Sequence, residues 1–255
     1  MTNVGMRRWA AALLRSAINR LRSTRRTALN IMRCKDHMTP PSDSFSPDKT
    51  RFDASAAQWD ENAERKAITA PIARAFGAIV DARGDLPDLL DYGCGTGQTS
   101  LPLADRCASV TGCDFSEAML AKFMDNAAAG EISNARTLCC NLASDPLPEV
   151  RFDMITCSLT LHHVADIPAL VEKFEQLLKP GGTLALVDLE TEDGSFHENN
   201  AGVAHYGFDK AQVVALLKAL GFADARARTL HTISRKRGDV VRKYPAFLAQ
   251  GTKAR

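Results

Sequence analysis

Three glycines spaced two apart are the first residues in this chain whose pattern points to chemistry. They are Gly93, Gly95 and Gly97 in "LLDYGCGTGQTS", and Asp91 lies two residues before the first of them. A glycine-rich turn after a buried strand brings backbone N–H groups close to a ligand, because glycine has no Cβ. The pattern therefore predicts a nucleotide-type ligand at this turn.

Neighbouring residues exclude two common nucleotide-binding motifs. A nicotinamide-binding fingerprint carries its third glycine at the sixth position, which is Gln98 here. A P-loop ends in Gly-Lys-Ser/Thr, and no lysine lies near this turn. The carboxylate of Asp91 would repel a pyrophosphate but suits a cationic group such as the ammonium of an amino acid. We therefore expect a ligand that is cationic at one end.

Apolar runs typical of strands alternate with helical patterns along the body of the chain. This alternation predicts a parallel sheet with helices on both of its faces. The late runs "FADARARTL" and "YPAFLAQG" are interpreted as a final pair of strands. Strands are expected at 88–93, 109–115, 135–142, 152–159 and 183–189. Helices are expected at 54–80, 117–129, 167–178 and 209–220, and a further helix is expected to start at 99–104.

A second motif closes the second predicted strand. Asp114 stands 17 residues after Gly97, within "GCDFSEAML", and "LLKPGGTLALVD" follows later. Together with the glycine turn, these segments resemble the motifs of class I S-adenosylmethionine-dependent methyltransferases, over about residues 52–250. The resemblance is closest to the small-molecule branch, of the methyltransferase type 11/12 kind, which includes the quinone-biosynthesis C-methyltransferases. It implies an α/β, Rossmann-like, doubly wound and mostly parallel seven-stranded sheet with a C-terminal antiparallel strand.

The same resemblance implies a role for each motif residue, with S-adenosylmethionine as the cofactor. The glycine turn wraps the methionine part, Asp114 accepts hydrogen bonds from the ribose hydroxyls, and Phe115 packs on the adenine. Asn141 stands where many relatives carry an acid for the adenine amino group, with Asp145 as an alternative and the Leu142 N–H for a ring nitrogen. The expected cofactor-binding residues are Asp91, Gly93, Cys94, Gly95, Gly97, Asp114, Phe115, Asn141, Leu142 and Ser158.

Two histidines directly follow the fourth predicted strand, at the sheet edge where ligands bind in open α/β folds. A sulfonium methyl is already activated, so the protein must align a nucleophile, exclude water and supply a base where the nucleophile is protonated. Neutral imidazole suits that task. His162 and His163 are therefore the predicted catalytic residues, and the alternative that they only pack or cap the next segment stays open.

Other polar residues favour substrate contact more than a metal. His197, His205, Tyr206 and Phe208 lie in a segment whose position is typical of a lid, and Trp59 is interpreted as a packing residue or a cover for the site. No spacing of these histidines with the nearby acids matches a ligand motif, so no metal is expected. The seven cysteines are scattered without a C-x-x-C pair, which indicates reduced thiols; Cys139 and Cys140 are expected on a buried strand.

Charge divides the chain into two parts. Residues 1–35 hold nine of the 32 basic residues and none of the 30 acidic ones, which leaves 23 against 30 in the rest, a net charge of −7. We expect residues 1–50 to be a disordered basic arm with a Pro/Ser-rich linker, and residues 51–255 to form the methyltransferase domain. The arm has three interpretations: an organelle transit peptide, a helix on an anionic membrane, or translated upstream sequence.

The acceptor is expected to be a small molecule. The acidic body argues against nucleic-acid binding by the folded domain, and the Asn/Asp-Pro-Pro-Tyr/Phe motif of enzymes that methylate base amines is missing after the fourth strand. Two alternatives remain: an RNA methyltransferase assisted by the basic arm, and a non-catalytic protein that binds S-adenosylmethionine. No membrane span is expected, and the location is predicted to be cytoplasmic, or an organelle if the arm is genuine. Oligomeric state, substrate and acceptor atom stay open.

Overall fold

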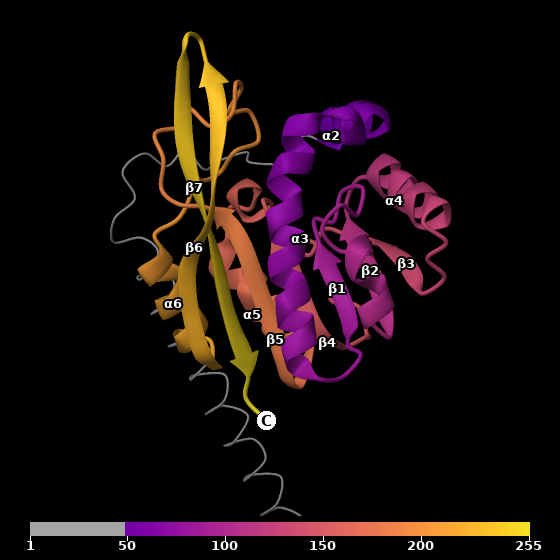
Figure 1. The fold of residues 1–255 in the computed structure, drawn as a ribbon. Coiled ribbons are helices and arrows are strands. Elements are labelled where there is room, and N and C mark those ends of the chain that lie inside the picture. The colour runs from indigo at the N-terminus through magenta and orange to yellow at the C-terminus, as the bar shows by residue number, and fades with distance from the viewer. Residues whose placement is uncertain (1–48) are drawn as a thin grey trace, which may run out of the picture.

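The computed structural model describes residues 49–255 (Figure 1), so the predictions for the basic arm lie outside the described residues. The helical segments are α2 (Lys49–Ser55), η1 (Ala56–Glu61), α3 (Ala63–Arg83), η2 (Leu101–Arg106), α4 (Glu117–Ala129), η3 (Leu161–His163), α5 (Ile167–Leu177) and α6 (Lys210–Ala219). The strands are β1 (Asp88–Tyr92), β2 (Ser109–Asp114), β3 (Ala135–Cys139), β4 (Phe152–Ser158), β5 (Leu178–Leu189), β6 (Phe222–Arg237) and β7 (Val240–Lys253).

Within the described residues, seven strands form one sheet in the order β3-β2-β1-β4-β5-β7-β6. Neighbouring strands from β3 to β5 pair in parallel, whereas β7 pairs antiparallel with both β5 and β6. From β1 the chain builds the sheet outward in one direction through β2 and β3, and it then returns to add β4 and β5 on the other side of β1. Such a switch in direction places a crevice beside the carboxyl end of β1. The predicted Rossmann-like, mostly parallel sheet with an antiparallel C-terminal strand is confirmed.

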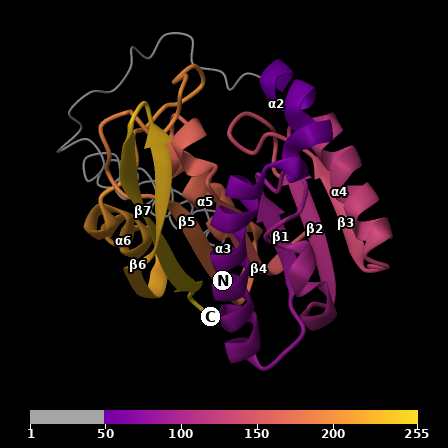
Figure 2. The same cartoon turned by 45° about the horizontal axis from the view of Figure 1, so that its top comes forward.

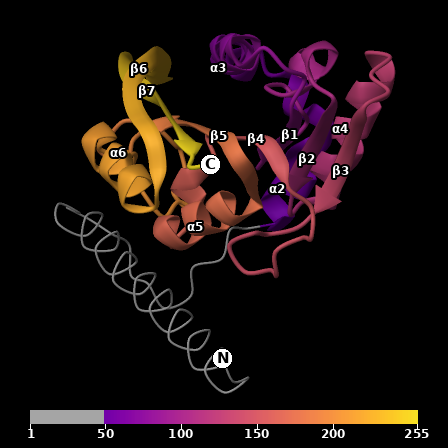
Figure 3. The same ribbon diagram turned by 90° about the horizontal axis from the view of Figure 1, so that it is seen from below.

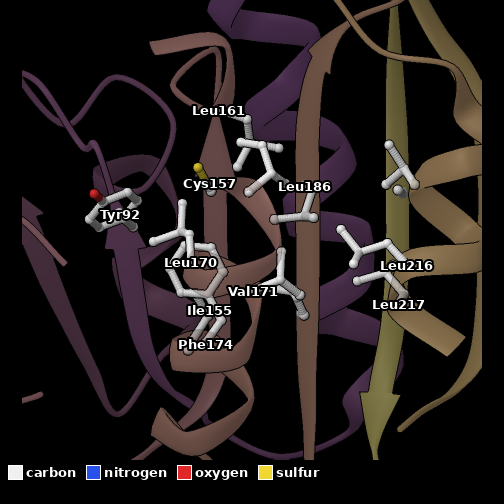
Figure 4. Close-up of a cluster of buried hydrophobic side chains, with 14 of the residues drawn as sticks. Tyr92, Ile155, Cys157, Leu161, Leu170, Val171, Phe174, Leu186, Leu216 and Leu217 are labelled. Carbon is white, nitrogen blue, oxygen red and sulfur yellow. The ribbon is translucent and has the colours of Figure 1, made fainter. Parts of the chain in front are cut away.

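Helices cover both faces of the sheet, as Figure 3 shows from below, with α3 on one side and α5 and α6 on the other. On the α3 side, Phe76 and Phe123 pack with apolar residues of β1 and β2. On the α5 side, Phe174 and Leu216 pack with the opposite face of the central strands (Figure 4). The central strands β1, β2, β4 and β5 are therefore buried on both faces, which explains their almost continuous apolar runs in the sequence.

The single helix predicted over residues 54–80 is wrong, because the chain breaks at Asn62. That residue has an extended conformation, and its side-chain Oδ1 accepts hydrogen bonds from the N–H groups of Glu64 (2.9 Å) and Arg65 (3.2 Å). An asparagine in this position caps the start of a helix. The segment before Asn62 forms α2 and η1. Because the break at Asn62 separates them from α3, these two elements can lie across the crevice.

Two further expectations need correction at the edges of the fold. The last two strands are longer than predicted, and their hairpin extends at the same end of the molecule as α2 (Figures 1 and 2). Cys139 is exposed instead of buried, and it lies on β3, which is an edge strand of the sheet that the described residues form. Among the described helices, none combines the length and apolar character that crossing a membrane requires.

We predict that Phe174→Ala destabilises the fold by about 3–5 kcal/mol, because it leaves a cavity in a closely packed core. Phe174 is fully buried, and its ring meets that of Tyr92 edge to face with 5.3 Å between centroids. Urea unfolding followed by circular dichroism measures the loss. Leu86→Ala is the control, since Leu86 is 64% exposed; equal losses in the two variants would contradict the assigned core.

Candidate functional site

A cavity of about 720 Å³ opens at the carboxyl ends of β1, β2 and β4. The turn after β1 forms one wall, α2 and η1 lie across it with Phe52 and Trp59, and the segment after β4 forms the opposite wall with Thr160 and the histidines. Its volume lies within the ~300–1,000 Å³ that is usual for small-molecule sites. The cavity is thus at the place where the topology predicts a ligand.

The glycine turn is shaped for close approach by a ligand. Gly93 has a φ of +69°, and a Cβ there would overlap the side chain of Thr160. Gly95 has a φ of +52°, and a Cβ there would find no atom nearer than Trp59 Nε1, at 3.9 Å. Gly93, Cys94 and Gly95 all line the cavity. The backbone at Gly95 therefore faces open space that a ligand can occupy.

Gly97 packs closely against the core. It does not line the cavity, and a Cβ there would lie 2.6 Å from Leu101 Cδ1 and 2.7 Å from Phe123 Cδ2. Its φ of +86° also favours glycine. This glycine lets the turn close onto the core, and the expected cofactor contact at Gly97 stays a prediction.

Asp114 lines the cavity at the end of β2 and fastens the glycine turn. Its Oδ2 accepts a hydrogen bond from the Gly95 N–H and its Oδ1 accepts one from the Ser116 N–H, each at 3.0 Å. Burial raises the pKa of this carboxyl, and the backbone N–H groups partly offset that effect. Each oxygen keeps a lone pair for a further donor, so the carboxylate can still accept hydroxyl groups from a ligand.

Asp91 lies below the cavity and does not line it. Its carboxylate is fully buried, where it accepts hydrogen bonds from Thr156 Oγ1 (2.9 Å) and Thr99 Oγ1 (3.2 Å). Thr99 in turn lies 3.5 Å from the hydroxyl of Ser158, and both of these residues line the cavity. The structure therefore places Asp91 behind the hydroxyl of Thr99, which lines the cavity, and the expected contact between Asp91 and a ligand ammonium stays a prediction.

The segment after β3 presents an amide to the cavity. Asn141 lines it, but its Oδ1 already accepts hydrogen bonds from the Ala143 N–H (3.1 Å) and the Tyr92 hydroxyl (3.4 Å). The side chain of Leu142 is buried in the core, and the carboxylate of Asp145 accepts a hydrogen bond from the Asn141 N–H, at 2.8 Å. The contacts with adenine that the sequence predicted for the Leu142 N–H and for Asp145 stay predictions.

Phe115 lines the cavity, as does Asn141. Its ring meets that of Phe52 edge to face, with 5.7 Å between centroids, so α2 covers this end of the cavity. Sequence reasoning missed Phe52, because the break at Asn62 that frees the preceding segment leaves only a weak signal in the sequence.

His162 and His163 are both fixed through Nδ1. His162 is 2% exposed, and its Nδ1 lies 2.7 Å from Oδ1 of the fully buried Asp188. His163 Nδ1 lies 2.5 Å from the Gly202 carbonyl oxygen. A carboxylate and a carbonyl can only accept, so Nδ1 carries the proton in both rings and Nε2 is the basic atom. Sequence reasoning missed Asp188, whose only signal is an acid within the apolar run "TLALVDL".

His197 approaches this pair from the loop after β5. Its Nε2 lies 3.2 Å from the Nε2 of His162, and all three rings line the cavity. Burial, together with the neighbouring His162, lowers the pKa of His163 to about 4 and that of His197 to about 3. Both rings are therefore neutral near pH 7. The sequence placed His197 in a lid, and the structure brings it to the predicted catalytic pair.

Arginines of the C-terminal hairpin hold that loop in place. Arg237 donates hydrogen bonds to the carbonyl oxygens of Ser195 and Phe196, and the Arg235 guanidinium stacks on the Phe196 ring at 4.0 Å from its centroid. Both arginines line the cavity. Trp59, which the sequence indicated as a possible cover, lines it as well, with the Arg65 guanidinium 3.7 Å from its ring centroid.

Comparison with known proteins agrees with this fold and site. Residues 90–186 match a family model described as a methyltransferase domain. The chain is 30% identical over 152 residues to an uncharacterized methyltransferase of Schizosaccharomyces pombe, over 54% of each chain. It is 33% identical over 104 residues to the demethylmenaquinone methyltransferase of Listeria monocytogenes, over 40% of this chain and 44% of that one. The chain thus spans about half the length of the curated relatives it matches.

A solved structure extends the likeness to the whole fold. Magnesium protoporphyrin IX methyltransferase from Synechocystis PCC 6803, with bound S-adenosylmethionine, superimposes with a TM-score of 0.58 and 18% identity, over 84% of this chain and 100% of that one. A doubly wound sheet with a glycine turn and an acid at its switch point defines a class of nucleoside-binding α/β proteins. Within that class, residues 90–186 of this chain are similar to the methyltransferase domain family, in agreement with the resemblance that the motifs carry.

We predict that Gly97→Ala destabilises the fold by about 1–3 kcal/mol more than Gly221→Ala, because overpacking adds to backbone strain. The two glycines have nearly equal φ values, +86° and +87°, but a Cβ at Gly221 meets no atom within 4 Å. The matched pair therefore isolates the contact with Leu101 and Phe123. Urea unfolding measures both variants, and equal losses would remove the packing role assigned to Gly97.

We predict that Asp91→Asn changes how stability depends on pH. Burial raises the pKa of Asp91 to about 6, so the folded state binds this proton more tightly than the unfolded state. Stability from this group is complete at low pH and is lost as pH rises through about 4 to 6. The unfolding free energy of the wild type minus that of the variant should fall by about 2–3 kcal/mol between pH 4 and pH 7. Denaturant unfolding at several pH values tests this, and a constant difference contradicts it.

Proposed function

We propose that this chain transfers a methyl group from S-adenosylmethionine to a small-molecule acceptor. The observation that carries the proposal is the carboxylate of Asp114, which lines the cavity while holding the open glycine turn at Gly95. An acid at the end of the second strand, beside a glycine turn on the first, is how folds of this topology bind an adenosyl ribose. The family of the domain in residues 90–186 supports the same cofactor.

The residues present fit that cofactor. Gly93, Cys94 and Gly95 offer backbone close to open space, with the hydroxyls of Thr99 and Ser158 beside them, for the methionine part. The free lone pairs of Asp114 would accept the two ribose hydroxyls. The adenine ring would pack on Phe115 near Asn141. Phe115, Asn141 and the turn all line one cavity, so a single ligand can touch them together.

The reaction asks little more of the protein than alignment and a proton acceptor. S-adenosylmethionine supplies a methyl group already activated by positive sulfur, so attack by the acceptor's lone pair returns the carbon–sulfur electron pair to sulfur. His162 and His163 are the residues we propose for acceptor activation, because their fixed Nδ1 protons leave Nε2 basic. Phe52 and Trp59 cover the cavity and would exclude water.

Cavity size and the kinds of relatives support a small-molecule acceptor. The cavity is lined by residues from several elements and has a volume of about 720 Å³, which suits one cofactor and a compact acceptor better than a polymer. The Listeria relative and the Synechocystis structure are named for a demethylmenaquinone and a magnesium porphyrin, which are small molecules. A cytoplasmic location belongs to the same proposal, because free buried thiols such as Cys94, Cys113 and Cys157 are typical of reducing compartments.

We predict that Asp114→Ala weakens binding of S-adenosylmethionine and of its product S-adenosylhomocysteine by about 1–3 kcal/mol, because the ribose hydroxyls lose their acceptor. Asp114→Asn, which keeps one accepting oxygen, should lose less. Isothermal titration calorimetry measures all three proteins. Asp125→Ala removes an exposed acid from α4 and is the control.

The absence of binding to the wild-type chain at millimolar S-adenosylmethionine would contradict the proposed function. Turnover is tested separately, by incubating the chain with methyl-labelled cofactor and a metabolite extract and following labelled products by mass spectrometry. Binding without any labelled product would favour the non-catalytic alternative.

A further inference from the structure

We propose that His162, His163 and His197 form a binding site for one divalent transition-metal ion of the zinc type. One ring nitrogen from each residue lies within 4.8 Å of the corresponding atoms of the other two, and all three rings line the cavity. Two come from the segment after β4 and the third comes from the loop after β5. No short spacing in the sequence joins them, so motif searching does not detect the group.

The distance between the two closest nitrogens fits such an ion. His162 Nε2 and His197 Nε2 are 3.2 Å apart. Two imidazole nitrogens bound to one tetrahedral zinc at 2.0–2.1 Å would be separated by about 3.3 Å. His163 has to move its ring inward to complete the set, since the group spans up to 4.8 Å.

Orientation of the rings is the second, independent observation. His162 donates from Nδ1 to the carboxylate of Asp188, and His163 donates from Nδ1 to the Gly202 carbonyl. Metal-binding histidines almost always donate their other ring N–H to a carboxylate or a backbone carbonyl, which fixes the ring and makes the ligand nitrogen more basic. Asp188 is itself fixed, since its Oδ1 accepts from the Leu189 N–H at 2.7 Å.

The charges that face the cluster set its affinity. Asp188 supplies a fully buried negative charge through the His162 ring. The positive charges of Arg51 and Arg235 act on His197 from α2 and β6, and they raise the cost of a further cation. We therefore expect weaker binding than at a structural zinc site with thiolate ligands.

This part of the inference rests on the proposed function. Three protein ligands leave a fourth position open, as in catalytic zinc sites. The cluster lines the same cavity as Asp114, so a hydroxyl acceptor can take that position. Binding to the ion lowers the pKa of the hydroxyl, its O–H bond breaks, and the proton passes to water. The oxygen lone pair then attacks the methyl carbon. The histidines would thus activate the acceptor through the ion.

Metal binding is tested on the full chain without a polyhistidine tag, after a chelator has removed bound metal. Co²⁺ is followed by its visible absorption and Zn²⁺ by calorimetry. We expect one equivalent to bind. His197→Ala should lower the affinity by more than about 10-fold, and Asp188→Asn by roughly 10–100-fold. His231→Ala is the control, because His231 is exposed on β6 and should leave the affinity unchanged.

Two results would overturn the site: no saturable binding of either ion, or an equal affinity in the wild type and His197→Ala. Near-ultraviolet thiolate-to-cobalt absorption would also overturn it, since it would place the ion at cysteines such as the exposed Cys139. Binding of S-adenosylhomocysteine to each variant shows that its fold is intact. Loss of the metal site with retained cofactor binding would leave the proposed methyltransferase function in place.

Discussion

The structure depends on the attachment of the turn after β1 to the end of β2. Asp114 accepts one hydrogen bond from the turn, at the Gly95 N–H, and another from the start of α4, at the Ser116 N–H. The N–H groups of Gly93 and Cys94 both donate to the Cys113 carbonyl. These bonds hold the glycine backbone open toward the cavity, so one carboxylate both shapes the cavity and remains available to a ligand.

Two buried acids order the rest of the cavity from behind. Asp91, at the end of β1, fixes Thr99 and Thr156, and Asp188, at the end of β5, fixes His162. Neither carboxylate touches the cavity, and both lie where burial disfavours charge. Hydrogen bonds from fixed partners offset that cost, and such networks are rigid because an unpaired buried acid is expensive.

The acceptor side is built from segments that are distant in the chain. The N–H groups of Ala204 and His205 donate to the His162 carbonyl, which joins the loop after β5 to the segment after β4. The arginines of the hairpin hold the same loop from the other side. The long β6–β7 hairpin thus contributes to the site as well as to the sheet. Its arginines contact the loop that carries His197, on the side of the cavity where we propose that the acceptor binds.

The sequence by itself determined the order of strands and helices, the position of the glycine turn and the acid at Asp114. Those features follow from local periodicity and from spacing within one β-α-β unit, where the chain has few choices. Only the tertiary structure decided that Asp91 and Gly97 face the core, that Asn62 ends one helix and begins another, and that Asp188 and His197 meet His162. The reason is physical: the direction of a side chain depends on strand register and on packing between elements, which nearby residues do not fix. The 26 and 35 residues that separate His162 from these two partners carry no short motif.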